Sequence, residues 1–235
     1  MKAVIVAAGR GSRLMNEHPK TLLPIDESTI LEHILRNLTK AGADEFVIVV
    51  GYQAQMIDAY LHENDNFGLK ITTVFNQDWQ RGNGLSVYAA RQAVNGESFV
   101  LSMSDHIVSP CALKRVIESE QQANLLLVDP DVKRVFDIDD ATKVFFDDKR
   151  IIRIGKELND YNGIDCGIFR LKPDFFDGIE AQLKKGEESI SAAVRELIRL
   201  QDMEAVFMNS DEWWIDIDTP EAYGFARENL LRIEK

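Results

Sequence analysis

Two glycines and two arginines stand in the run A-A-G-R-G-S-R-L at 7–14, directly after an apolar segment that predicts a buried strand over 1–7. Glycine and small residues let backbone N–H groups approach an anion closely, and basic side chains neutralise its charge. Lys20 adds a further cation just downstream. We therefore expect this segment to bind the phosphates of a nucleotide, with Arg13 and Lys20 acting in catalysis. The nucleotide-binding residues predicted here are Ala7, Ala8, Gly9, Arg10, Gly11, Ser12, Arg13 and Lys20.

The spacing of the glycines excludes two common nucleotide-binding motifs. A dinucleotide-binding fingerprint needs a third glycine three residues after the second, and Leu14 stands at that position. A Walker loop needs a glycine, four residues and then Gly-Lys-Ser or Gly-Lys-Thr, a run that the chain does not contain. A bare Gly-x-Gly is also compatible with an ordinary turn between a strand and a helix. Other residues must therefore decide between a phosphate-binding loop and a structural turn.

Three aspartates make up a candidate metal site. Asp105 directly follows a predicted strand, and Asp216 and Asp218 alternate in an apolar run near the C-terminus, so we expect these two to point to the same face. Ligands of open α/β sheets bind beyond the carboxyl ends of the strands, where these side chains would meet. Carboxylates together with substrate phosphates are typical ligands of Mg²⁺. The alternative is that Asp218 caps the last helix and Asp105 the preceding turn.

The composition limits the partners of the chain. With 27 basic and 39 acidic side chains in 235 residues the net charge is -12, which argues against nonspecific binding to nucleic acid or anionic membranes. No apolar run reaches the length of a membrane span, and the N-terminal segment is too short for a signal peptide. Cys111 and Cys166 lie far apart without metal-ligand spacing, which is typical of a reduced, cytoplasmic protein.

Short apolar runs alternate with stretches of helical periodicity in the first half of the chain, the pattern of a parallel sheet covered by helices. The segment at about 130–170 is richer in strands, and we interpret it as an insertion on the substrate side. Thr29 and Glu32 predict a capping box for a helix that ends at Gly42. We therefore expect one α/β domain over 1–235 with a Rossmann-like, mixed and mostly parallel sheet. Further strands are predicted over 46–50, 70–75, 98–103, 141–146, 151–154, 164–171, 204–208 and 213–218, and further helices over 53–62, 85–94, 173–185, 189–201 and after 219.

The combined motifs resemble the nucleotidyltransferase family that makes nucleotide-activated sugars and alcohols. The resemblance rests on A-A-G-R-G-S-R-L at 7–14, P-K-T-L-L-P-I at 19–25, Asp105 and the terminal W-I-D-I-D-T-P-E at 214–221, and so spans nearly the whole chain. It implies the nucleotide-diphospho-sugar transferase fold, which is also described as GT-A-like. It further implies that a nucleoside triphosphate reacts with a phosphorylated small molecule and that pyrophosphate is released.

Within this family the chain is similar to CTP:inositol-1-phosphate cytidylyltransferases. The similar segments are R-G-N-G-L-S at 81–86, M-S-D-H at 103–106, D-D-A-T-K-V at 139–144, I-G-K at 154–156 and G-I-D-C-G at 163–167. An Asn amide and a Ser hydroxyl can pair with cytosine, and lysines can bind a phosphate. The resemblance implies that Asn83, Gly84, Ser86 and Ser104 lie at the nucleotide and that His106, Lys143, Lys156 and Asp165 face the acceptor.

The predicted reaction is an attack by the acceptor phosphate on the α-phosphorus of CTP, with Mg²⁺ held by Asp105, Asp216 and Asp218. The phosphate is already ionised near neutral pH, so we expect His106 to orient Asp105 or an acceptor group and not to act as a base. Phosphocholine, a phosphonate or a sugar 1-phosphate are alternative acceptors, and UTP, GTP or dTTP are alternative donors. For phosphocholine, an aromatic cage could come from Tyr161, Trp213 and Trp214.

A different class of function is a noncatalytic domain that senses nucleotides. The joint presence of Arg13, Lys20, Asp105 and Asp216 argues against it, since a binder of this kind has no need for the metal-binding set. In some relatives the inositol enzyme is fused to a membrane domain. We therefore expect either a stand-alone enzyme or a cytosolic fragment, and the sequence leaves the oligomeric state open, with a dimer as one alternative.

Overall fold

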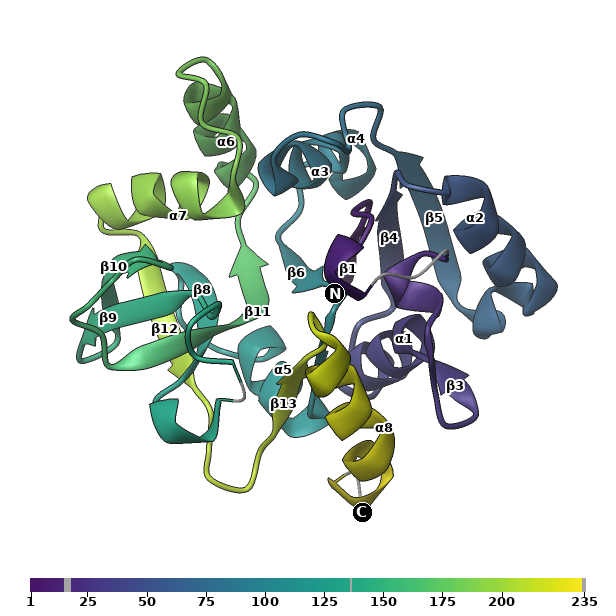
Figure 1. Cartoon of the computed structure of the whole chain (residues 1–235). Helices are drawn as coiled ribbons and strands as arrows, with labels where there is room; N and C mark the ends of the chain where they lie inside the picture. The colour runs from purple at the N-terminus through teal and green to yellow at the C-terminus, as the bar shows by residue number, and fades with distance from the viewer. Residues whose placement is uncertain (15–17, 136, 234–235) are drawn as a thin grey trace.

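The computed structural model describes residues 1–14, 18–135 and 137–233. A nine-stranded mixed sheet forms the centre of the molecule, in the order β5-β4-β1-β6-β11-β8-β12-β10-β9. Helices cover both faces of this sheet (Figure 1). Two further pairs of strands, β13-β7 and β2-β3, lie outside it. No helix among the described residues is both long and apolar enough to cross a lipid bilayer.

The N-terminal half contributes four parallel strands. β1 (Lys2–Ala7) pairs with β4 (Glu45–Val50) on one side and with β6 (Phe99–Met103) on the other, and β4 pairs with β5 (Lys70–Phe75). The parallel strands predicted for this half are thereby confirmed. Because parallel strands point the same way, the loops that follow β1 and β6 leave the sheet at the same edge.

Apolar side chains on the two faces of the sheet form two core clusters. One cluster joins the sheet to α1, α2, α5 and α8, and the other joins it to α3, α4, α6 and α7. The predicted capping box is confirmed, because the Thr29 hydroxyl accepts from the Glu32 backbone N–H and the Glu32 carboxylate accepts from the Thr29 N–H. The helices are α1 (Ile30–Lys40), α2 (Ala54–Glu63), α3 (Asn83–Ala89), α4 (Arg91–Val94), α5 (Pro110–Ile117), α6 (Phe175–Leu183), α7 (Ile190–Arg199) and α8 (Pro220–Ile233).

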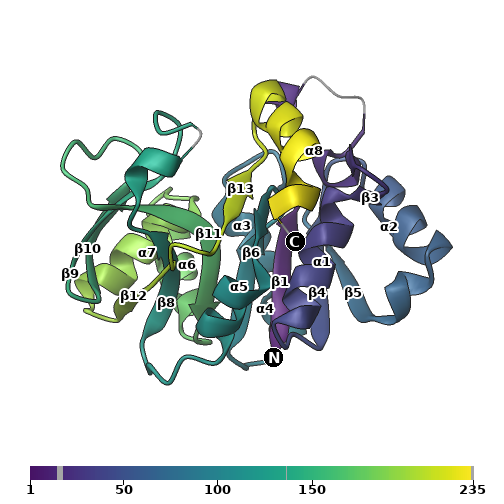
Figure 2. The same cartoon turned by 90° about the horizontal axis from the view of Figure 1, so that it is seen from below.

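The second half of the sheet is mainly antiparallel. β11 (Gly163–Leu171) runs antiparallel to β6 and to β8 (Asn124–Asp129), whereas β12 (Met203–Phe207) runs parallel to β8. β10 (Arg150–Gly155) and β9 (Lys143–Asp147) continue the sheet as an antiparallel pair. The strand-rich segment therefore extends the central sheet (Figure 2). That the whole chain is one domain stays a prediction, which this continuous sheet supports.

Several short elements differ from the sequence predictions. No element was predicted for 107–129, which holds α5, β8 and most of the three-residue strand β7 (His106–Val108). The helix predicted over 85–94 starts at Asn83 and is split at Ala90 into α3 and α4. The closing strand predicted over 213–218 is only β13 (Trp214–Asp216), which pairs antiparallel with β7. The remaining short elements are β2 (Pro24–Ile25), β3 (Ser28–Thr29) and the 3-10 turns η1 (Ser12–Leu14), η2 (Lys20–Leu22), η3 (Asp65–Gly68) and η4 (Val132–Arg134).

Candidate active site

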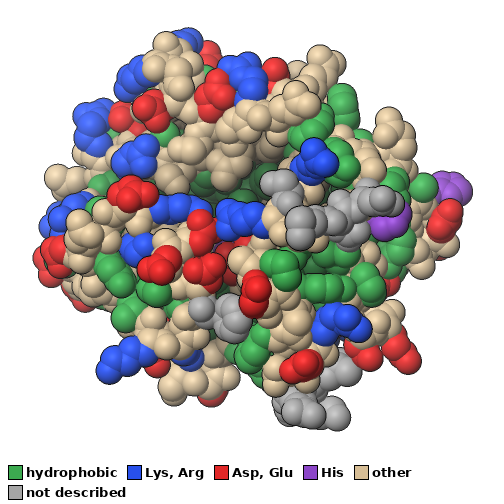
Figure 3. Space-filling view, viewed as in Figure 1, with side chains coloured by type: hydrophobic (Ala, Val, Ile, Leu, Met, Phe, Trp, Pro, Cys, Tyr) green, Lys and Arg blue, Asp and Glu red, His purple; other side chains and the backbone are tan. Residues whose placement is uncertain are grey.

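Charged side chains of both signs gather across the middle of the face shown in Figure 3. A cavity of about 290 Å³ lies at the carboxyl ends of β1 and β6. The cavity brings together predicted residues from four distant parts of the sequence. These residues are Gly9, Gly11, Arg13 and Lys20 after β1, Asn83 and Ser86 on α3, Ser104 and Asp105 after β6, and Asp218 before α8.

The loop after β1 has a conformation that explains one of its glycines. Gly11 has φ 62°, and a Cβ at this position would lie 2.8 Å from the Cβ of Lys20. Apart from its two chain neighbours, no atom of the described residues would lie within 4 Å of a Cβ on Gly9, and Gly9 lines the cavity. Gly11 is therefore needed by the fold, whereas Gly9 leaves space that a ligand can enter.

The other residues of this predicted loop lie around it. The side chains of Ala7 and Ala8 are buried, and the Ala8 carbonyl accepts a hydrogen bond from the Tyr52 N–H at 2.9 Å. Arg10 is exposed, with its guanidinium 5.6 Å from the centre of the Tyr52 ring. Ser12 begins η1. Arg10 is not among the described residues that line the cavity, and its role in nucleotide binding stays a prediction.

Replacing Gly11 by alanine is expected to lower the free energy of unfolding by about 1 to 2 kcal/mol, because a side chain is strained at positive φ and Lys20 would have to move. Gly9→Ala is the matched control, with an expected change of less than about 0.5 kcal/mol but weaker binding of nucleoside triphosphates. Urea unfolding and calorimetric titration measure the two effects. Equal losses of stability in both variants would contradict the distinct roles of the glycines.

Lys20 lies at the centre of the site, where it is almost fully buried. Its Nζ donates to Asp105 Oδ2 at 2.7 Å and also to Asp218 Oδ1. Burial by itself lowers the pKa of Lys20, but the charges of the two carboxylates and these hydrogen bonds raise it above its usual value. The lysine is therefore a permanent cation that holds the end of β6 to the segment before α8.

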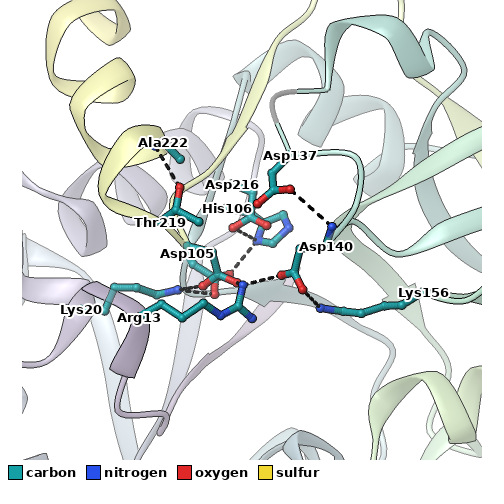
Figure 4. A network of polar contacts seen from close by, with 11 residues as sticks. Arg13, Lys20, Asp105, His106, Asp137, Asp140, Lys156, Asp216, Thr219 and Ala222 are labelled. Carbon is teal, nitrogen blue, oxygen red and sulfur yellow. Dashed lines mark hydrogen bonds and ion pairs between the residues drawn. The ribbon is translucent and has the colours of Figure 1, made fainter. Parts of the chain in front are cut away.

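Asp105 and Asp216 meet because β7 and β13 pair with each other. Asp216 stands opposite His106 in this pairing, and Asp105 immediately precedes His106. Ligand atoms of Asp105, His106 and Asp216 all lie within 4.8 Å of one another (Figure 4). Burial raises the pKa of Asp105, but Lys20 and His106 outweigh this and hold it well below its usual range. Burial raises the pKa of Asp216 to about 6.

His106 is enclosed on several sides. Its Nδ1 lies 2.6 Å from Asp105 Oδ1, its ring stacks on Trp214 with 5.6 Å between the ring centres, and a Cβ on Gly167 would collide with the ring. Burial lowers the pKa of His106, but the charges of Asp216 and Asp105 raise it to about 9. These contacts match a role in orienting the Asp105 carboxylate, one of the two roles predicted for this residue.

Asp218 is placed differently from the sequence prediction. β13 ends at Asp216, so Asp218 does not share a face with Asp216 on a strand. Its carboxylate instead pairs with Lys20 and with Arg13, whose NH1 lies 3.3 Å from Oδ2. It does not cap α8 through its side chain, because Thr219 Oγ1 accepts from the Ala222 N–H. Asp218 is not part of the group formed by Asp105, His106 and Asp216, and its predicted role as a metal ligand stays a prediction.

The donor set at the start of β7 and the end of β13 fits Mg²⁺. Among the described residues, Asp216 Oδ1 is a buried carboxylate oxygen without a hydrogen-bond partner, and such an oxygen is costly unless a cation or water satisfies it. Mg²⁺ takes oxygen ligands and usually combines one or two carboxylates with water and substrate phosphates. Asp105 and Asp216 supply these oxygens, while the imidazole of His106 is a poorer ligand for this ion and is already bonded to Asp105.

The predicted base-binding segment is fixed mainly by contacts with the start of α7. Asn83 Oδ1 accepts from the Ile190 N–H at 2.9 Å, and the Gly84 N–H donates to the Glu188 carbonyl at 2.8 Å. A Cβ on Gly84 would lie 2.6 Å from that carbonyl oxygen. The Ser86 hydroxyl is buried and accepts from Asn76 Nδ2 at 3.0 Å. One lone pair of Asn83 Oδ1 is thus used within the protein, and the contact of Asn83 with the base stays a prediction.

Five further residues that the sequence reasoning missed line the same cavity, namely Val6, Thr21, Trp79, Arg81 and Met103. Trp79 is the most informative, because its half-buried ring lies at the rim beside Tyr52, with 5.5 Å between the ring centres. A Cβ on Gly51 would collide with Trp79. The only signal in the sequence was an aromatic residue in the loop after β5, which is not specific.

The residues predicted to face the acceptor are held by different contacts, and their role at the acceptor stays a prediction. Lys143 is buried, and its Nζ donates to the backbone carbonyls of Asp139 and Lys156 at 3.2 and 2.9 Å. Lys156 Nζ donates to Asp140 Oδ1 at 2.9 Å. Asp165 Oδ1 accepts from the Gly167 N–H at 2.7 Å, and burial raises the pKa of Asp165 to about 6. Of these, Lys156 lies in the charged network of Figure 4, whereas Lys143 holds the backbone together.

Known proteins with similar sequences cover nearly the whole of this chain. A bifunctional IPC transferase and DIPP synthase of Thermococcus kodakarensis is 31% identical over 231 residues, which are 98% of this chain and 51% of the relative. A protein of the same name from Aquifex aeolicus is 32% identical over 98% of this chain and 52% of its own length. The chain thus spans about half the length of the curated relatives it matches.

Solved structures confirm the predicted fold class. The inositol-1-phosphate CTP transferase from T. maritima superposes with a TM-score of 0.87 and 25% identity, and the match covers 100% of this chain and 96% of that one. A UDP-glucose pyrophosphorylase complexed with UDP-glucose has the same fold, with a TM-score of 0.83, 18% identity and 98% of each chain covered.

The sequence of the chain also matches the model of a domain family. Residues 3–159 match the MobA-like NTP transferase domain, and this range contains the loop after β1, Lys20, the segment at 81–86 and Asp105. The matched range is more than half of the chain and holds most of the residues around the cavity. The chain therefore belongs to the family of MobA-like NTP transferase domains.

Proposed function

We propose that this protein transfers CMP from CTP to the phosphate of a small alcohol, with inositol 1-phosphate as the preferred acceptor, and releases pyrophosphate. The observation that carries the proposal is the convergence of the Asp105 and Asp216 carboxylates beside the cavity that is lined by the glycine loop, Arg13 and Lys20. The similarity to the inositol-1-phosphate CTP transferase from T. maritima supports the choice of donor and acceptor.

In this reaction an oxygen of the acceptor phosphate forms a bond to the α-phosphorus of CTP. The bond from that phosphorus to the oxygen bridging to the β-phosphorus breaks, and pyrophosphate leaves with the electron pair. Repulsion between the two anions is the main obstacle, and Arg13 and Lys20 reduce it by donating hydrogen bonds to the triphosphate. Mg²⁺, held by Asp105 and Asp216, would neutralise charge that develops on the phosphates.

Trp79 is expected to contribute to nucleotide affinity by stacking on the base. Replacing it by alanine should raise the dissociation constant for CTP on the order of ten-fold, since stacking of a base on an aromatic ring is worth about 1 to 3 kcal/mol. Trp79→Phe keeps a ring and should retain most of the affinity. Calorimetric titration with CTP measures both variants, and wild-type affinity in Trp79→Ala would exclude the stacking role.

A second cavity keeps phosphocholine as an alternative acceptor. It measures about 210 Å³ and is lined by Trp213, Trp214, Phe225 and several carboxylates, including Asp216. Aromatic faces and carboxylates together favour a quaternary ammonium group. Tyr161, the third aromatic residue suggested by the sequence, lies instead beside Lys143, with 6.0 Å between the Lys143 Nζ and the ring centre.

A screen of pyrophosphate release separates these functions. Each nucleoside triphosphate is combined with inositol 1-phosphate, phosphocholine, aminoethylphosphonate or a hexose 1-phosphate in the presence of Mg²⁺. We expect the highest kcat/KM for CTP with inositol 1-phosphate. A higher value for CTP with phosphocholine would favour the alternative acceptor, and no release with CTP and any acceptor would refute the proposed function.

A further inference from the structure

Asp140 joins two cations that come from different parts of the site. One carboxylate oxygen, Oδ2, accepts a hydrogen bond from Arg13 NH1 of the loop after β1. The other, Oδ1, accepts from Lys156 Nζ, directly after β10, at 2.9 Å. In Figure 4 the carboxylate lies between the two basic side chains. A single anion, supplied by the protein, thus bridges the nucleotide loop and the strand-rich segment.

The bridge lies between the two cavities of the site. Arg13 and Asp218 line the first cavity, and Asp140 and Asp218 line the second, so the Arg13–Asp140 pair lies at the boundary between them. Arg13 NH1 is also 3.3 Å from Asp218 Oδ2, which places the bridge one side chain away from the group around Lys20. An attacking phosphate has to reach the α-phosphorus at such a boundary.

The Asp140 carboxylate can pair with the same kinds of basic side chain as a phosphate monoester. A phosphate has three acceptor oxygens and more negative charge, and arginine pairs with either group through charge-assisted hydrogen bonds. Burial raises the pKa of Asp140, but the hydrogen bonds that its carboxylate accepts from Lys156 and Arg13 lower this pKa below its usual value. The Asp140 carboxyl group is therefore ionised at neutral pH. An incoming phosphate therefore finds both cations already paired with a protein carboxylate.

The side chain of Asp140 can also move away from Arg13 and Lys156. It lies in the turn between η4 and β9, where the Ala141 N–H donates to the Asp137 carbonyl at 3.1 Å, and it precedes the first strand residue, Lys143. Its side chain is about one-third exposed. A change of its rotamer releases both cations without breaking any hydrogen bond of the sheet.

We propose that Asp140 occupies the subsite of the acceptor's phosphate and competes with it, so that the phosphate of the acceptor binds between Arg13 and Lys156 after displacing this carboxylate. The ligand class is a phosphate monoester or inorganic phosphate. This inference rests on the proposed function for the identity of the acceptor, but not for the position of the subsite.

The test compares Asp140→Asn with Asp139→Asn, a neighbouring exposed aspartate that undergoes the same change of charge. Binding of inorganic phosphate to the metal-free protein is followed by ³¹P NMR titration. Asp140→Asn removes the two partly exposed ion pairs with Arg13 and Lys156, and it also removes the repulsion between the carboxylate and the incoming phosphate. The variant should therefore bind phosphate on the order of ten-fold more tightly than wild type. Asp139→Asn should bind like wild type.

A third variant locates the bound phosphate. Adding Lys156→Met to Asp140→Asn should cancel the gain in affinity, because one of the two cations of the subsite is then missing. Unchanged or weaker binding in Asp140→Asn, or a gain that survives Lys156→Met, would overturn the inference. These measurements need no turnover, so failure of the pyrophosphate screen would refute the proposed function while leaving the phosphate subsite to be judged by its own result.

Discussion

Asp105→Asn is expected to lower the rate of pyrophosphate release by about 100-fold or more, while the far-ultraviolet circular dichroism stays that of the wild type. The Asp105 carboxylate accepts a hydrogen bond from Lys20 Nζ and lies 2.6 Å from His106 Nδ1. Together with Asp216 it forms the candidate metal site. Asparagine keeps the size of the side chain but removes its negative charge. Charge stabilisation and metal binding should therefore be lost together, and steady-state kinetics with increasing Mg²⁺ should show a much weaker response to the ion.

Asp177→Asn provides the matched control for this variant. Asp177 lies on α6, is largely exposed and pairs only with Arg91 among the described residues, so its replacement should leave the rate unchanged. Addition of EDTA to the wild type should lower the rate as strongly as Asp105→Asn does. A variant Asp105→Asn with near-wild-type turnover would show that the group at the end of β6 does not take part in the reaction.

Lys20→Met is expected to lower both the rate and the stability of the metal-free protein. The loss of the ammonium group leaves the carboxylates of Asp105 and Asp218 without their central cation in a largely buried position. Removing one partner of a buried ion pair costs about 3 kcal/mol or more, so unfolding in urea with EDTA should shift to clearly lower denaturant concentrations. The rate of pyrophosphate release should fall by about 100-fold or more, since the triphosphate loses a preorganised cation.

Magnesium should distinguish the two roles of Lys20. Because the ammonium group and the metal ion interact with the same carboxylate, Asp105, added Mg²⁺ should restore much of the stability of Lys20→Met but not its activity. Lys70→Met is the control, since Lys70 is exposed on β5 and pairs with Glu45 at the surface. It should unfold like the wild type. Equal stability of Lys20→Met and wild type in EDTA would show that the internal ion pairs do not hold the site together.

Most of the sheet could be predicted from local sequence patterns. The strands at 46–50, 70–75, 98–103 and 164–171 and the helix between Thr29 and Gly42 agree with β4, β5, β6, β11 and α1 within a few residues. Runs of apolar residues mark β4 and β6, which are buried on both faces, and the capping box marks the start of the helix, whereas β5 is largely exposed. These signals depend only on neighbouring residues, so they can be recognised without the tertiary structure.

β7 could not be predicted in this way, whereas the buried apolar run from Leu125 to Val128 in β8 carries the same local signal as the other strands and was missed. β7 and β13 are three residues long, and each is a strand only because the other lies beside it, more than 100 residues away in the sequence. The same pairing ends the closing strand at Asp216 and directs Asp218 toward Lys20 and Arg13. The expectation that Asp216 and Asp218 share one face was therefore wrong, since it assumed that the strand continued.

The types of residue needed for the chemistry were determined by the sequence alone. A glycine loop with Arg13 and Lys20, together with Asp105 and Asp216, indicated phosphate and metal binding, because few other arrangements use these side chains at the ends of buried strands. Which groups touch was decided only by the tertiary structure. Lys20 lies between two carboxylates, and Asp140, which the sequence did not single out, bridges Arg13 and Lys156. The two residues of such an ion pair are 16 positions apart in the sequence for Asp140 and Lys156, and 198 apart for Lys20 and Asp218. The packing of the sheet and its loops brings them together, and no local pattern in the sequence specifies this.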